Sequence, residues 1–122
     1  MKHHSLVCCL IIALGLGIAE PPRAIAQTAR ENSEAQKLFS EGVELQHDGN
    51  FVEAEKKFRA AVSQYPKAEN ADRTAYFLIN TLKKLKRVQD ARTEIDNFRR
   101  SYPQSKWLAD VNEMAFILGG QQ

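Results

Sequence analysis

The chain has 122 residues, enough for one small domain with a modest core. Its formal net charge is +2, and residues 27–122 carry 15 cations against 14 anions, a net charge of +1. This balance provides no general attraction to nucleic acid or to anionic lipid, so the composition disfavours proteins that bind either one through overall charge.

The first 26 residues have the pattern of a secretory signal peptide. A short basic start is followed by an apolar run at residues 6–18, by two prolines, and by Ala24-Ile25-Ala26. That order is typical of a cleavable export signal, and the run is shorter than the about 20 residues that span a bilayer. We expect cleavage after Ala26, which makes the protein periplasmic or secreted. An uncleaved membrane anchor is the alternative.

Both cysteines of the chain, Cys8 and Cys9, lie inside the apolar run. A lipoprotein would carry its lipidated cysteine at the end of such a run, after small residues, whereas Ser5-Leu6-Val7 precede Cys8. We therefore interpret both as apolar filler that is removed with the signal peptide. The mature chain then has no disulfide to form and no thiol nucleophile.

After a polar lead-in at residues 27–32, apolar residues recur at helical spacing and predict five helices and no strand. The first helix covers residues 33–47, with Ser33 as its N-terminal cap, and it ends at Gly49. The second begins after a capping Asn50 and ends before Pro66. The others cover about residues 70–85, 88–101 and 105–118, and residues 120–122 form a tail.

An internal repeat relates these helices. Two Tyr-Pro pairs, at residues 65–66 and 102–103, lie 37 residues apart. The same shift aligns Leu45 with Leu82 and Ala54 with Ala91, and it places Gly42 on Ile79 and then on Phe116. A fixed period of this length indicates a repeat protein.

The repeat resembles that of the tetratricopeptide-repeat (TPR) family, whose unit of about 34 residues is a helical hairpin. Repeat one, residues 33–66, matches well, and repeat two, residues 70–103, is weaker, with bulky Ile79 and Phe98 where small residues are usual. The matching repeat positions are Gly42, Ala54, Phe58, Ala61, Pro66, Leu78, Ala91 and Pro103. The resemblance implies an all-α, TPR-type helical hairpin solenoid of about two and a half repeats over residues 33–119, with residues 105–118 as a terminal helix.

Small residues are expected at the helix crossing of each hairpin, because two helices approach closely only where a side chain is missing. Gly42 would thus admit Ala54 or Ala61, while the aromatic residues fill the wider gaps between hairpins.

The linker at residues 102–108, Tyr-Pro-Gln-Ser-Lys-Trp-Leu, is similar to linkers of bacterial envelope TPR proteins. These include the outer-membrane barrel-assembly lipoprotein BamD and the periplasmic Tol–Pal coordinator. The similarity implies a partner in envelope assembly or in cell-wall machinery.

In TPR proteins the first helix of each hairpin lines a concave groove that binds a protein or peptide segment. The resemblance places eight candidate partner-binding residues there: Phe39, Val43, Gln46, Arg73, Tyr76, Asn80, Lys83 and Lys84. Such a groove could hold an acidic or extended segment. Alternatively, Lys83 and Lys84 only stabilise the C-terminal end of their helix, because cations interact favourably with the helix dipole there.

The fifth helix has no following partner in the predicted pattern. It can serve as a cap that covers the last hairpin, which accounts for Trp107 and Phe116 as core residues. Alternatively, Trp107, Met114 and Phe116 form an apolar patch through which a second copy binds, giving a self-associating structural module.

The sequence contains no pattern of catalytic or metal-binding residues. His47 is the single histidine after residue 26, and Glu44 and Asp48 beside it are ordinary charges near a helix end. Phosphate-binding loops and hydrolase motifs are absent. We therefore expect a non-catalytic protein that needs no cofactor, binds no nucleic acid, and does not insert its mature domain into the membrane.

Overall fold

The structure, a computed structural model, describes the backbone of residues 2–120 and the side chains of residues 23–120. The predictions about Cys8, Cys9 and the apolar run at residues 6–18 concern side chains outside this range. The chain divides into two compact units, Met1–Glu31 and Asn32–Gln122.

The first helix begins earlier than the sequence pattern predicted. Helix α1 covers Lys2–His47, so residues 27–32 are helical and Ser33 lies inside the helix. The predicted cap at Ser33 is therefore wrong, because its backbone N–H belongs to a continuing helix and needs no capping side chain. The first unit consists of the N-terminal part of α1, in which residues 23–31 are exposed.

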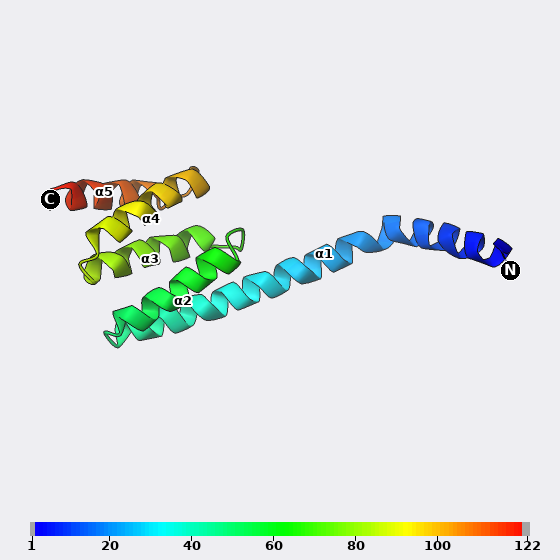
Figure 1. Cartoon of the computed structure of the whole chain (residues 1–122), viewed down its shortest axis with the longest axis horizontal. Helices are drawn as coiled ribbons and strands as arrows, with labels where there is room; N and C mark the ends of the chain where they lie inside the picture. Colours follow the sequence, from blue (N-terminus) through cyan, green and yellow to red (C-terminus); the bar gives the residue numbers. More distant parts are fainter. Residues whose placement is uncertain (1, 121–122) are drawn as a thin grey trace. The chain divides into compact units, whose positions relative to one another are not determined.

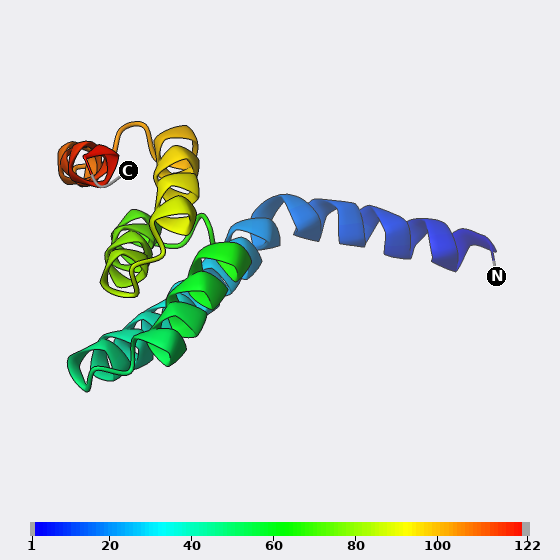
Figure 2. The same ribbon diagram turned by 60° about the vertical axis from the view of Figure 1, so that its left-hand side comes forward.

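Four further helices complete the second unit: α2 (Phe51–Gln64), α3 (Ala71–Lys84), α4 (Val88–Ser101) and α5 (Leu108–Gly119). Consecutive helices run in opposite directions, and each lies beside the next, as the two views show (Figure 1, Figure 2). Helix α4 has the predicted bounds, and the described residues contain no strand. The predicted all-α hairpin architecture with five helices is confirmed.

The turns inside the two hairpins repeat each other bond for bond. After α1, Gly49 adopts a φ of 80°, and the Asn50 N–H donates to the Leu45 carbonyl at 2.8 Å. After α3, Lys86 adopts a φ of 62°, and the Arg87 N–H donates to the Leu82 carbonyl at 3.0 Å. These left-handed turns close both helices through their backbones. The predicted side-chain cap at Asn50 is not formed.

Gly42 marks the crossing of the first hairpin, but its partner differs from the expected alanines. A Cβ atom at Gly42 would lie 2.5 Å from Cε1 of Phe58, whose side chain is fully buried. The Phe58 ring therefore packs against α1 inside the hairpin and also against Phe77 of the next hairpin. Ala54 and Ala61 are buried, as expected.

The core of the second unit runs through both hairpins to α5. Leu78, Ile79 and Leu82 of α3 lie at its centre, with Ala91, Ile95 and Phe98 of α4 and Val111 and Leu118 of α5. The two Tyr-Pro turns are joined by a hydrogen bond, because the Tyr102 hydroxyl donates to the Pro66 carbonyl at 2.9 Å. Pro66 and Pro103 themselves are exposed in these turns.

Candidate functional site

The first helices of the hairpins, α1, α3 and α5, carry the residues that sequence reasoning assigned to partner binding. On α1, the Phe39 ring packs against Phe77 at 5.1 Å and against Phe58 at 5.9 Å between ring centroids. The guanidinium of Arg73 lies 4.1 Å from the Phe39 centroid, within the range of a cation–π interaction. These contacts hold Phe39 between the first and second hairpins.

Two further predicted residues of α1 also contact the next hairpin. Val43 is partly buried against the core. The Gln46 amide donates to the Thr81 hydroxyl at 3.2 Å, and Thr81 in turn donates to the Phe77 carbonyl at 2.7 Å. Gln46 is therefore an inter-repeat contact as well as a candidate binding residue.

Tyr76 on α3 is joined to Trp107, which directly precedes α5. Their rings are stacked, with centroids 4.7 Å apart and an angle of 27° between planes. This contact connects a residue predicted to bind a partner with one predicted to mediate self-association. Among the described atoms, the Trp107 Nε1–H and the Arg73 Nε–H are buried and have no hydrogen-bond acceptor.

Asn80 and Lys83 differ from the residues above because their side chains do not join helices. These two side chains make no hydrogen bond or ion pair with any residue in the described part of the chain. The Lys84 ammonium lies 5.7 Å from the Phe51 ring centroid and is exposed. The side chains of Asn80 and Lys83 can therefore contact a ligand without breaking a bond to another described residue.

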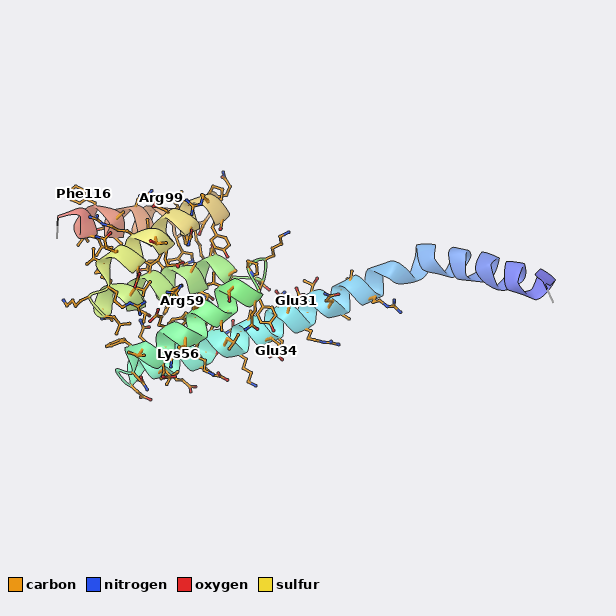
Figure 3. The ribbon with its side chains drawn as sticks, in the orientation of Figure 1. Glu31, Glu34, Lys56, Arg59, Arg99 and Phe116 are labelled. Carbon is orange, nitrogen blue, oxygen red and sulfur yellow. The ribbon has the colours of Figure 1, made fainter. Side chains whose placement is uncertain are left out.

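The predicted self-association residues are placed in three different environments. Trp107 is half-buried in its stack, and Met114 is only 6% exposed, within the core. Phe116 is 85% exposed and points away from the other helices (Figure 3). Its neighbour Ile117, which sequence reasoning did not single out, is 42% exposed. Its position in the 37-residue register could have identified it, since it aligns with Val43 and Asn80.

The second helices, α2 and α4, are joined by an ion-pair network. Arg59 donates to Glu55 and to Glu94, each at 3.0 Å, and Arg87 pairs with Glu55 and with Asp90. Burial disfavours the charge on Arg59, but its hydrogen bonds to Glu55 and Glu94 outweigh this and raise the pKa of the guanidinium. These charged side chains of the α2 and α4 side thus form ion pairs with each other.

The described residues contain neither a metal site nor a membrane span. No group of three His, Cys, Asp or Glu side chains there is arranged to hold a metal ion. In the same part of the chain, no helix is both long enough and apolar enough to cross a membrane.

A family described as outer membrane lipoprotein (YfiO) matches residues 31–120, which include every described residue of the second unit. No curated protein and no solved structure matches the chain.

Proposed function

The chain belongs to the outer membrane lipoprotein (YfiO) family, and on that premise we propose that it is a non-catalytic scaffold of the bacterial cell envelope. It docks an extended segment of a partner protein on the concave face formed by α1, α3 and α5. The family places the protein in the envelope and favours a role in protein–protein interaction. The choice of the docking face is supported by the arrangement of the side chains.

One observation carries the choice of this face. The side chains of Asn80 and Lys83 are half-buried on α3, yet no described residue bonds to them. Their polar atoms still reach solvent, because the buried side-chain atoms without a partner in the described residues are Arg73 Nε and Trp107 Nε1. Beside them, Tyr76 is held rigidly by Trp107. A fixed aromatic surface next to unused polar groups suits an extended peptide, whose backbone offers both donors and acceptors.

For the location of the protein, we keep the interpretation that residues 1–26 are a cleaved export signal. A family described as lipoprotein raises a second possibility, lipid attachment at Cys8 or Cys9, the only cysteines in the chain. The mass of the protein recovered from the envelope separates the two. Cleavage after Ala26 leaves an unmodified N-terminus at Gln27, whereas an acyl mass on a longer chain would overturn this interpretation.

The docking proposal is tested by crosslinking in the native envelope with a tag after Gln122. Wild type is compared with Asn80→Ala/Lys83→Glu, which changes two groups without structural bonds. Tyr76 is left intact because its removal would break the stack on Trp107. We expect one crosslinked protein to be lost in the variant. A matched control, Val52→Ala/Lys56→Glu, changes exposed residues of α2 and should retain it. Loss in both variants, or in neither, contradicts the proposal.

The exposure of Phe116 favours a second candidate function, self-association through α5. In the 37-residue register Phe116 aligns with Gly42 and Ile79, and both of these face the second helix of their hairpin or the core. A helix from a second copy could cover Phe116 in the same way.

A further inference from the structure

The 37-residue register places corresponding positions of α1, α3 and α5 on one face. Two hydrogen bonds show this register in the structure. The Asn32 Oδ1 accepts from the Glu69 N–H at 2.9 Å, and the Gln36 Oε1 accepts from Arg73 Nη2 at 3.1 Å. Both pairs are 37 residues apart. Equivalent residues of α1 and of the second repeat are therefore adjacent, whereas α3 meets the start of α5 through the Tyr76–Trp107 stack and the hydrogen bond from Ser105 to Asp72.

The three helices present different charges at these positions. The strip on α1 has no Asp, Glu, Lys or Arg, the strip on α3 is basic, and the strip on α5 is acidic. In order, the strips are Gln36, Phe39, Val43, Gln46 and His47 on α1; Arg73, Tyr76, Asn80, Lys83 and Lys84 on α3; and Asp110, Glu113, Ile117 and Gly120 on α5. The charge of this face thus changes from neutral on α1 to positive on α3 and to negative on α5.

Arg73 joins α3 to α1 through Gln36 and Phe39, but four other charged groups of these strips form no ion pair in the described part of the chain. Within the described residues, Lys83, Lys84, Asp110 and Glu113 form no ion pair. By contrast, Glu55, Arg59, Arg87 and Glu94 of the opposite side all do. Charges that are left unpaired on one face, while those of the other face pair with each other, are available to select a ligand by electrostatic complementarity.

We propose that this face selects an extended partner segment whose side chains run apolar, acidic and basic across α1, α3 and α5. The apolar part lies on Phe39 and Val43, the acidic part contacts Lys83 and Lys84, and the basic part contacts Asp110 and Glu113. This inference rests on the proposed docking function and adds the chemistry and the order of the partner.

The spacing of the strips sets the spacing of the partner's charges. Packed helices lie about 8–10 Å apart, and an extended chain advances about 3.3 Å per residue. The acidic and basic residues of the partner should therefore be separated by about three positions. The interactions are solvent-exposed, so added salt should weaken them.

Two synthetic peptides of identical composition test the order. One carries a leucine block, then glutamates, then lysines; the other carries leucines, then lysines, then glutamates. Each is titrated into the isotopically labelled protein, purified in its exported form, and followed by the amide resonances. We expect the first peptide to bind more tightly and to shift resonances of α3 and α5. Each charge should contribute about a twofold to fivefold change in affinity, the range of exposed ion pairs.

A variant with exchanged charges provides the matched control. Lys83→Glu/Lys84→Glu combined with Asp110→Lys/Glu113→Lys leaves the net charge unchanged and should reverse the preference between the peptides. Circular dichroism confirms that the variant is folded. Equal binding of the two peptides, an unreversed preference, or binding of neither peptide overturns the proposed charge order. If the envelope crosslink is nevertheless lost in Asn80→Ala/Lys83→Glu, the docking function stands without the charge order. If the crosslink is unaffected by that variant, the docking function fails as well.

Discussion

At the residue scale, Gly42 leaves no room for a side chain beside Phe58. Three ring atoms of Phe58 would lie within 2.9 Å of an added Cβ, and the ring is confined by Phe39 and Phe77. Relief would therefore require a shift of the whole ring or of the two helices.

We predict that Gly42→Ala lowers the free energy of unfolding by about 1–2 kcal/mol. Overpacking a core costs about 1–3 kcal/mol, and the higher helix propensity of alanine returns up to about 1 kcal/mol. Urea unfolding followed by circular dichroism measures the difference. Gly119→Ala is the control, because nothing lies within 4 Å of its added Cβ. Equal stability of the two variants would show that the contact with Phe58 is not tight.

Tyr102 makes the stability of the protein sensitive to alkaline pH. Burial, assisted by the negative charge of Asp72, raises the pKa of the Tyr102 hydroxyl above its usual value. The fold therefore favours the protonated phenol, which donates to the Pro66 carbonyl. Its stabilising contribution is complete below the ordinary pKa of about 10 and is lost as the pH rises through the folded-state pKa.

Comparison with Tyr102→Phe tests this. Near neutral pH the variant should be less stable by about 0.5–1.5 kcal/mol, the usual contribution of one hydrogen bond. The difference should stay constant from about pH 8 to about pH 10 and shrink above about pH 10, because only wild type then loses a proton-dependent contribution. Urea unfolding from about pH 8 to about pH 11 is the measurement. A difference that stays constant with pH would mean that the hydroxyl has no role in the alkaline transition.

The sequence predicts which residues are buried better than it predicts which residues touch. Ala54, Phe58, Leu78 and Ala91 are buried as the repeat implied. The pairing of Gly42 with Phe58 and the stacking of Tyr76 on Trp107 were not foreseen. Such contacts depend on the angle and offset at which helices pack, and helical periodicity carries no information about either.

At the element scale, helix ends that are set by a proline or by a repeated tight turn were predicted closely. The end of α2 at Gln64 and the bounds of α4 follow from the two Tyr-Pro pairs and from a turn that repeats every 37 residues. The start of α1 was not predicted, because residues 27–32 contain no glycine or proline to stop a helix that continues from Ala26.

Helix α5 carries a prediction of its own through Phe116. If a second copy covers this residue, wild type should form dimers and Phe116→Ala should shift them toward monomer, because the buried aromatic area is lost. Sedimentation at several protein concentrations measures this. Val52→Ala, which removes an exposed apolar side chain from α2, is the matched control. A wild type that stays monomeric at all concentrations would exclude self-association by α5.

At the scale of the whole molecule, the two sides of the second unit use their charges differently. The α2 and α4 side pairs its charges and so joins the two hairpins. The α1, α3 and α5 face anchors its aromatic residues and leaves Asn80 and Lys83 without partners in the described chain. A scaffold needs both properties: a side that keeps the repeats in register and a face that remains available to a partner.

The most direct test of this arrangement is photocrosslinking in living cells with a crosslinking amino acid placed at one position at a time. Position 80 on α3 probes the proposed docking face, and position 56 on α2 probes the opposite side. We predict that position 80 captures one defined envelope protein and that position 56 does not. Capture of that same protein from position 56, with none from position 80, would contradict docking on the α1, α3 and α5 face.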